Sequence, residues 1–178
     1  TVRISVTVFT KAIAHAGPDK AVMKGATINL EGSIQGDYDS FYWTPSTGLS
    51  NIHSLTPTVL AFNDMMYQLI AVSKNNCGNS LDAVAVKLYN DIYIPNIFTP
   101  DNNGINDTWN IPALQAFPQF ELYVYDRYGK IVYTAHKQFI PWDGTYKNTA
   151  LPVGAYTYLI RLNNQAKDIF KGSILLMR

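Results

Sequence analysis

The segment FTPDNNGINDTW, residues 98–109, gathers residue types that readily bind a cation. Asp101, Asn103 and Asp107 place carboxylate and amide oxygens around Gly104, which permits a sharp bend. Ca²⁺ accepts such oxygens in flexible geometry, so these three residues are candidate calcium ligands. The segment is not an EF-hand loop, because an isoleucine stands where that motif needs a ligand and no glutamate closes the loop.

The same loop can instead be a turn that its own side chains hold together. Asn and Asp side chains accept hydrogen bonds from backbone N–H groups a few residues further along the chain. Two formal negative charges, from Asp101 and Asp107, make a weak calcium site. The sequence therefore favours the self-bonded turn. Calcium is the alternative, and no other cofactor is expected.

The residues that could take part in catalysis do not occur at the spacings of known catalytic motifs. The histidines His15, His53 and His136 stand apart, without metalloprotease spacing or a nucleophile elbow nearby. Cys77 is the single cysteine, so it has no internal disulfide partner, and no basic residue adjoins it to activate the thiol. Asp143, like the other aspartates that could pair for glycoside hydrolysis, falls in a turn sequence. The sequence predicts a protein that is not an enzyme.

Composition excludes several classes of partner. The chain has 178 residues and a formal net charge of +1, so it has no overall field that would attract nucleic acid or an anionic membrane. No run of eighteen or more apolar residues occurs, and we expect no membrane-spanning helix. Aromatic residues make up 13% of the chain, which suits half-buried strands.

Period-two alternation predicts an all-β chain of two tandem antiparallel β-sandwich domains of the immunoglobulin-like type. The second domain begins near IYIPNIFTP (92–100). Gly129 follows Asp126 in a turn between two predicted strands, where a left-handed residue suits a hairpin bulge. The predicted strands cover 27–34, 40–45, 58–62, 67–74, 82–90, 120–126, 129–135, 154–163 and 170–177.

The predicted organisation has three parts. Residues 1–13 are expected to be the terminal strand of a preceding module, or a linker, because TVRISVTVF alternates apolar and polar residues. We therefore expect a piece of a longer protein, with a signal peptide upstream. Residues 14–90 form the first sandwich, with Trp43 in a strand where such folds bury an aromatic residue, and residues 91–178 form the second.

Five motifs follow one another in the second half of the chain. They are PNIFTPDNNGINDTWNIP (95–112), FELYVYDRYGKIVY (120–133), WDGTY (142–146), LPVGAYTYLI (151–160) and KGSILLMR (171–178). Together they resemble the gliding-motility-associated C-terminal domain, the type B sorting domain of the Bacteroidetes type IX secretion system. AGPDKAVMKGATINLEGS and FYWTPSTGLSN, within about residues 15–90, resemble PKD-type immunoglobulin-like modules.

The loop of that family usually reads FTPNGDG followed by ND. Gly104, Asn106 and Asp107 match this pattern, whereas Asn103 replaces the central aspartate and removes one charge from the possible calcium site. The resemblance thus favours a structural role for the loop motifs. Their residues are Asp101, Asn103, Gly104, Asn106, Asp107, Trp142, Asp143 and Gly144.

The resemblance implies a function in export. Such proteins cross the inner membrane by a signal peptide, pass through the periplasm, and are sent by the C-terminal domain to the cell surface or extracellular space. Implied partners are components of the type IX translocon, a PorP-like outer-membrane protein and the upstream domains of the same polypeptide. The cargo would be a large cell-surface adhesin that serves gliding.

The last strand offers a candidate docking surface. In SILLM, Leu175 and Met177 face one way, while Ile174 and Leu176 face the other. A two-layer sandwich buries only one face of a strand, so a loop, the neighbouring domain or the secretion partner must cover the second. We expect Ile174 and Leu176 to dock on the partner as an apolar patch or by strand addition. The wider candidate set is Lys171, Gly172, Ile174, Leu175, Leu176 and Met177.

A glycan-binding or adhesion module is the alternative function. Trp142 and Tyr146 of the WDGTY motif could stack on a sugar ring. A tryptophan beside an Asp-Gly turn is more often a core residue whose indole N–H has a local acceptor. The sequence therefore favours the structural interpretation of this motif.

Overall fold

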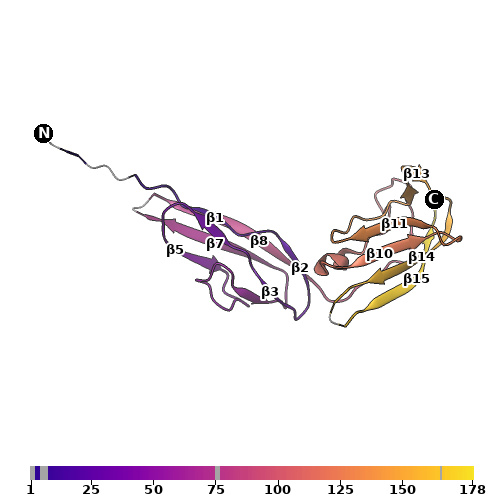
Figure 1. The fold of residues 1–178 in the computed structure, drawn as a ribbon, viewed down its shortest axis with the longest axis horizontal. Coiled ribbons are helices and arrows are strands. Elements are labelled where there is room, and N and C mark those ends of the chain that lie inside the picture. The colour runs from indigo at the N-terminus through magenta and orange to yellow at the C-terminus, as the bar shows by residue number, and fades with distance from the viewer. Residues whose placement is uncertain (1–2, 5–7, 75–76, 165) are drawn as a thin grey trace. The chain divides into compact units, whose positions relative to one another are not determined.

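The computed structural model of the chain describes residues 3–4, 8–74, 77–164 and 166–178. The chain divides into two compact units, Thr1–Leu88 and Tyr89–Arg178, each with its own hydrophobic core (Figure 1). None of the helices within the described ranges has the length and apolar character needed to cross a membrane.

The N-terminal unit is built from one four-stranded sheet and two smaller two-stranded sheets. The large sheet has the order β2-β8-β7-β5, and the small ones pair β1 with β4 and β3 with β6. The strands are β1 (Ile13–His15), β2 (Lys20–Met23), β3 (Thr27–Asn29), β4 (Ser33–Gln35), β5 (Tyr38–Thr44), β6 (Thr58–Leu60), β7 (Met65–Ser73) and β8 (Asn79–Tyr89).

The core of this unit lies between the large sheet and the segments that carry the small sheets. Trp43, Tyr67 and Leu69 come from the large sheet and pack with Leu30 and Val59 of the opposite layer. Trp43 is buried and donates its indole N–H to the Ser54 carbonyl at 2.8 Å. The prediction of an immunoglobulin-like sandwich with a buried Trp43 is confirmed.

Two predicted strands of this unit differ in the structure. The strand expected over 27–34 is two strands, β3 and β4, in different sheets. Gly32 lies between them against the Trp43 ring, where an added Cβ would approach Cζ2 to 2.6 Å, so the position has no room for a side chain. The strand expected over 1–9 lies partly outside the described residues, and the described ones, among them Ile4 and Val8, are in no strand.

The segment around the predicted boundary at residue 13 joins the first unit. Thr10 donates its backbone N–H to the Asp37 carboxylate at 2.9 Å, and Ala12 donates its own to Ser73 Oγ at 2.9 Å. The hydrogen bond from the Thr10 backbone N–H, followed by that from the Thr10 hydroxyl, lowers the pKa of Asp37. The assignment of the residues before Thr10 to a preceding module stays a prediction.

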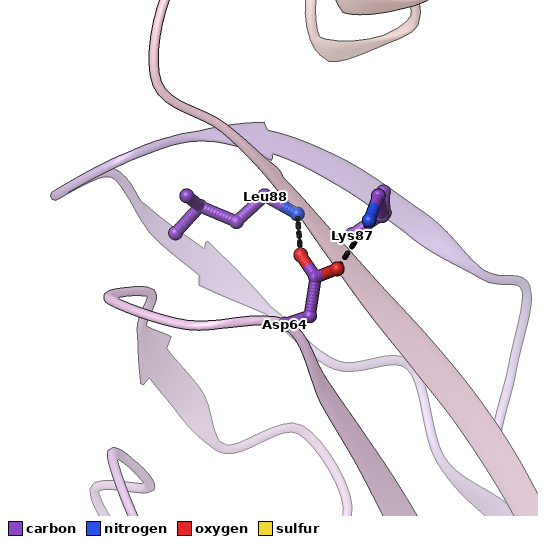
Figure 2. A network of polar contacts seen from close by, with 3 residues as sticks. All are labelled: Asp64, Lys87 and Leu88. Atoms are coloured by element: carbon purple, nitrogen blue, oxygen red, sulfur yellow. Dashed lines mark hydrogen bonds and ion pairs between the residues drawn. The ribbon is translucent and has the colours of Figure 1, made fainter.

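A polar clasp ties the start of β7 to the end of β8 (Figure 2). Asp64 accepts a hydrogen bond from the Leu88 backbone N–H at 2.7 Å and pairs with the Lys87 ammonium group. The Lys87 hydrogen bond, followed by that of Leu88, holds the pKa of the Asp64 carboxyl below its usual value. Both charged groups are exposed, so the clasp orders a strand end rather than filling the core.

The C-terminal unit contains one five-stranded sheet with the order β11-β10-β14-β15-β9 (Figure 1). Its pairs are antiparallel except that β9 joins β15 in parallel. Gly129, with φ of 79°, closes the β10–β11 hairpin beside a register shift at Tyr125, as the sequence predicted. The elements are β9 (Ile97–Phe98), η2, a 3-10 helix (Pro112–Ala116), β10 (Glu121–Tyr125), β11 (Ile131–His136), β12 (Thr145–Tyr146), β13 (Thr149–Ala150), β14 (Gly154–Arg161) and β15 (Ile169–Leu176).

The inner face of this sheet is covered by loops, by η2 and by the small β12–β13 hairpin. Sheet residues such as Leu122, Ile160 and Ile174 pack against Trp109 and Trp142 from the loops. In the segment 92–100, where the second domain was expected to begin, Ile97 and Phe98 form a short strand. Pro95 and Pro100 flank it, and proline cannot donate to a ladder. The second sandwich is therefore a sheet and a loop-rich second layer.

Candidate functional site

The loop at residues 99–107 is closed by its own side chains. Asp107 accepts backbone N–H groups from Asp101 at 3.1 Å and Asn102 at 2.6 Å through one oxygen, and from Gly104 at 2.7 Å through the other. Asn103 Oδ1 accepts the Ile105 N–H at 2.7 Å. These bonds have the pattern of the self-bonded turn that the sequence favoured.

Left-handed residues let this loop fold back on itself. Asn102, Gly104 and Asn106 have φ of 62°, 86° and 53°, a region in which Gly and Asn are the usual residues. The Thr99 N–H donates to the Asn106 carbonyl at 2.9 Å and closes the base of the loop. Within the described ranges, no three His, Cys, Asp or Glu side chains are grouped to hold a metal ion. Calcium binding by Asp101, Asn103 and Asp107 stays a prediction.

The WDGTY motif is joined to the core. Trp142 is buried, donates its indole N–H to the Thr145 carbonyl at 3.0 Å, and contacts Phe98 and Tyr156 at ring-centroid distances of 5.3 Å and 5.5 Å. Backbone hydrogen bonds of 2.7 Å and 3.1 Å link Trp142 to Trp109. A sugar ring cannot reach Trp142, so this residue has the structural role and the glycan platform suggested for it is excluded.

Asp143 and Gly144 shape the turn that follows Trp142. Asp143 Oδ1 accepts the Thr145 backbone N–H at 2.9 Å and its hydroxyl at 2.8 Å. Gly144 has φ of 76°, and an added Cβ would approach Leu176 Cδ1 to 2.7 Å. Burial, followed by the charge of Asp143, raises the pKa of Tyr133 to about 12. The turn thus fits closely against the inner face of the last strand.

The two faces of β15 are not equivalent. Ile174 and Leu176 are 1% and 0% exposed and belong to the core. The docking role expected for these two residues is therefore wrong, because a partner cannot contact side chains that the loop layer already covers. The alternation itself was predicted correctly, and it leaves the opposite residues, including Leu175 and Met177, exposed.

An apolar patch surrounds Leu175 on the outer face. Leu175 lies beside Ile97 of β9, its parallel partner, and beside Ala155 of β14, its antiparallel partner. A shallow pocket of about 330 Å³ is lined by Val153, Gly154 and residues 175–178. We name Ile97, Val153, Leu175 and Met177 the Leu175 patch; these side chains are 43%, 61%, 39% and 44% exposed.

The edge of β15 is open beside this patch. Leu175 and Met177 donate backbone N–H groups to the carbonyls of Asn96 and Phe98, at 2.8 Å and 3.1 Å. Alternate residues of a strand direct these groups to the same side, so Lys171 and Ser173 direct theirs past the end of β9. Neither has a hydrogen-bond partner there among the described residues. Extended backbone of this kind can accept another strand.

Gly172 lies on the inner face, opposite Tyr158 of β14. An added Cβ would approach the Tyr158 hydroxyl oxygen to 2.7 Å, so the glycine makes room for this ring. The Tyr158 ring in turn contacts Trp109 at a centroid distance of 5.3 Å. The geometry therefore gives Gly172 a packing role, whereas Lys171 remains accessible on the outer side.

Comparison with known families bears on the C-terminal unit. Residues 92–176 match the family model described as the CHU_C type IX secretion signal domain. This match supports a sorting role, and a signal domain of this type directs export to the cell surface or extracellular space. From here on the label signal domain denotes residues 89–178, the compact unit that contains this match. The match also points to a non-enzymatic module that interacts with the type IX secretion machinery.

The whole chain resembles solved structures only distantly. Sidekick-1 immunoglobulin domains 1–5 align at 12% identity and a TM-score of 0.43, over 96% of this chain and 39% of theirs. The D00-D0 domain of Intimin aligns at 9% identity and a TM-score of 0.39, over 94% and 100%. A chimeric titin Z1Z2 aligns at 17% identity and 0.38, over 48% and 100%. The fold assignment rests on the strand order described above. No curated protein sequence matches the chain.

Sequence reasoning missed two members of the Leu175 patch. Ile97 and Val153 reach it through the sheet pairing rather than through sequence proximity. The alternation in FKGSILLM was enough to separate Leu175 and Met177 from Ile174 and Leu176, but it did not tell which pair is buried. Gly144 is an indirect indication of which pair is buried, because a residue without a side chain at this position leaves space for Leu176.

Proposed function

We propose that the signal domain is recognised through the Leu175 patch and the open edge of β15. The observation that carries this proposal is the exposure of Leu175 and Met177 beside unpaired backbone at Lys171 and Ser173. A partner strand laid along this edge would gain backbone hydrogen bonds, and the patch would bury its apolar side chains. Both contributions come from folded surface, as a signal carried by a compact domain requires.

The partners proposed for this surface are translocon components of the type IX system and a PorP-like outer-membrane protein. The exported cargo is a large adhesive protein of the cell surface that takes part in gliding. The N-terminal unit is a PKD-type module that separates the signal domain from upstream domains. The family match and the resemblance of the five sequence motifs support this proposal.

An export assay tests the proposal directly. Residues 89–178, and separately residues 1–178, are fused to a fluorescent reporter that carries a signal peptide, in a host with a working type IX system. Both fusions should reach the cell surface or the medium. If neither fusion leaves the periplasm while the protein binds a surface polysaccharide, the adhesion module replaces the sorting signal as the best function.

A charge placed in the patch tests the surface itself. Leu175→Lys should leave the reporter in the periplasm, because a lysine ammonium group cannot be buried without a partner. Ile131→Lys is the matched control, since Ile131 is 42% exposed on β11 at the opposite edge of the same sheet. Thermal melting establishes that both variants fold. Normal export of a folded Leu175→Lys protein would remove the patch from the mechanism.

A further inference from the structure

On a second surface of the signal domain, basic side chains lie over tyrosine rings. The ammonium group of Lys130 lies 4.4 Å from the ring centroid of Tyr146, and that of Lys147 lies 5.6 Å from the same centroid. The guanidinium group of Arg127 lies 5.0 Å from the ring centroid of Tyr128. We name Arg127, Lys130 and Lys147 the basic turn cluster.

Two turns from different parts of the sequence bring the cluster together. Arg127 and Lys130 belong to the β10–β11 turn, whereas Lys147 belongs to the β12–β13 turn. Lys130 reaches Tyr146 of the second turn. Asp126, Arg127 and Tyr128 also line a pocket of about 180 Å³ with residues 151–156, the segment that follows the second turn. The β10–β11 turn therefore contacts Tyr146 through Lys130 and lies beside residues 151–156 through Arg127.

The carboxylates near this surface accept hydrogen bonds from residues of their own turns. Asp126 Oδ1 accepts the backbone N–H groups of Tyr128 at 2.9 Å and Lys130 at 3.0 Å. Asp143 Oδ1 is bound to Thr145. Within the described part of the chain, none of the three cations forms an ion pair. A further cation, Arg178, donates to the Leu151 carbonyl at the border of the pocket.

The backbone holds Lys147 in an unusual conformation. Lys147 and Asn148, at the centre of the β12–β13 turn, have φ of 51° and 61°. Two-residue hairpin turns with positive φ at both positions prefer Asn-Gly, and a lysine there is strained by its Cβ. The strained turn keeps the Lys147 side chain beside Tyr146 and close to Lys130.

We propose that the basic turn cluster binds an acidic peptide segment of another protein. The tyrosine rings hold the cations in place without neutralising them, so less side-chain freedom is lost when carboxylates bind. Three cations on two adjoining turns match carboxylates spaced along an extended chain. An acidic polysaccharide fits less well, because cations already lie over the ring faces on which sugars would stack.

This surface is separate from the Leu175 patch, and its test does not depend on export. The probe is a fluorescein-labelled oligoglutamate peptide titrated with residues 1–178 at low salt, with oligoglutamine and polygalacturonate as comparison ligands. Fluorescence anisotropy should show saturable binding of oligoglutamate only. Binding should weaken as salt approaches about 0.15 M, where charges are screened over about 8 Å.

Two triple variants with the same charge change locate the site. Arg127→Gln/Lys130→Gln/Lys147→Gln should weaken oligoglutamate binding by about threefold to a hundredfold, the range for three exposed ion pairs. The control, Arg161→Gln/Lys137→Gln/Lys167→Gln, removes three exposed cations elsewhere in the signal domain and should change the affinity much less. Thermal melting of both variants checks folding.

Three outcomes would overturn the proposal. Equal losses in the two triple variants would mean that net charge alone attracts the peptide. Binding of polygalacturonate without oligoglutamate would assign the surface to acidic polysaccharides. Absence of saturable oligoglutamate binding to the folded wild-type chain at low salt would mean that the cluster does not recognise acidic peptides.

Discussion

The two units of the chain bury their tryptophans in different ways. In the N-terminal unit, Trp43 extends from the regular strand β5 into the space between two strand layers. In the signal domain, Trp109 and Trp142 lie outside the named strands and come from loops that cover one sheet. All three indoles donate to backbone carbonyls, at 2.8 Å, 2.7 Å and 3.0 Å.

This difference shows what the loops of the signal domain do. They form the second layer of its core, and their aspartate side chains accept hydrogen bonds from the backbone. The strands, in contrast, leave their outer face exposed around Leu175. In this domain the exposed apolar side chains around Leu175 lie on the sheet, while the 99–107 loop is held together by its own hydrogen bonds.

The largest expected effect is the loss of stability in one unit when its buried tryptophan is replaced. Trp142→Ala should destabilise the signal domain by about 3–5 kcal/mol, because a large buried side chain is replaced by a cavity. Trp43→Ala should have a similar effect on the N-terminal unit. Denaturant unfolding of residues 1–178, followed by a probe in each unit, should show one shifted transition per variant. A shift of both transitions by either substitution would contradict the separation into two cores.

A smaller effect is expected when a loop is forced away from the sheet. Gly144→Ala should destabilise the signal domain by about 2–4 kcal/mol, since the new Cβ meets Leu176 and the residue has positive φ. Gly104→Ala is the matched control: its φ is 86°, but an added Cβ meets nothing within 4 Å. It should cost only about 1–2 kcal/mol. Equal losses in chemical denaturation would show that the Leu176 contact does not matter.

The clasp within the 99–107 loop should have a moderate effect. Asp107→Ala removes the acceptor of three backbone N–H groups and should cost about 1–3 kcal/mol in thermal unfolding. Asp107→Asn keeps one oxygen acceptor and should cost less. Added Ca²⁺ should leave the melting temperature of the wild-type chain unchanged if the loop is only a turn. A calcium-dependent rise that Asp107→Ala abolishes would instead establish a cation site.

The smallest effect belongs to the exposed clasp of the N-terminal unit. Its hydrogen bonds lower the pKa of Asp64, so the clasp contributes stability above the unfolded-state pKa of 3.8 and loses it as the pH falls further. Asp64→Asn should therefore lower the melting temperature slightly at pH 7 and have no effect in strong acid. Asp39→Asn, at another exposed aspartate, serves as control. A melting-temperature difference between Asp64→Asn and the wild-type chain that grows as the pH falls would contradict this prediction.

Local sequence patterns were sufficient for most of the strands and for both cores. The prediction of a buried Trp43 from its place in a central strand, and the turn signal at Gly129, both agree with the structure. These features depend on neighbours a few residues away, which a sequence displays directly. The self-bonded 99–107 loop could be predicted for the same reason, because an Asx turn forms from residues that are close together in the sequence.

Features that depend on distant pairing could not be predicted. Nothing in FKGSILLM tells which of its two apolar faces meets Trp142, because that choice is made by loops far away in the sequence. The parallel pairing of β9 with β15, which places Ile97 beside Leu175, has no local signal either. The docking residues were therefore assigned to the wrong face. Lys130 and Lys147 were missed because two separate turns bring them together.

The position of β15 inside its sheet has a consequence during protein synthesis. Because β15 lies between β14 and β9, Phe98 and its neighbours cannot pair until the ribosome has made β15, which begins more than seventy residues later. A nascent chain interrupted before Ile169 lacks Ile174 and Leu176 and cannot complete the hydrophobic interior of the domain. A shortened chain would therefore leave Phe98 and the sheet residues of this core exposed to water.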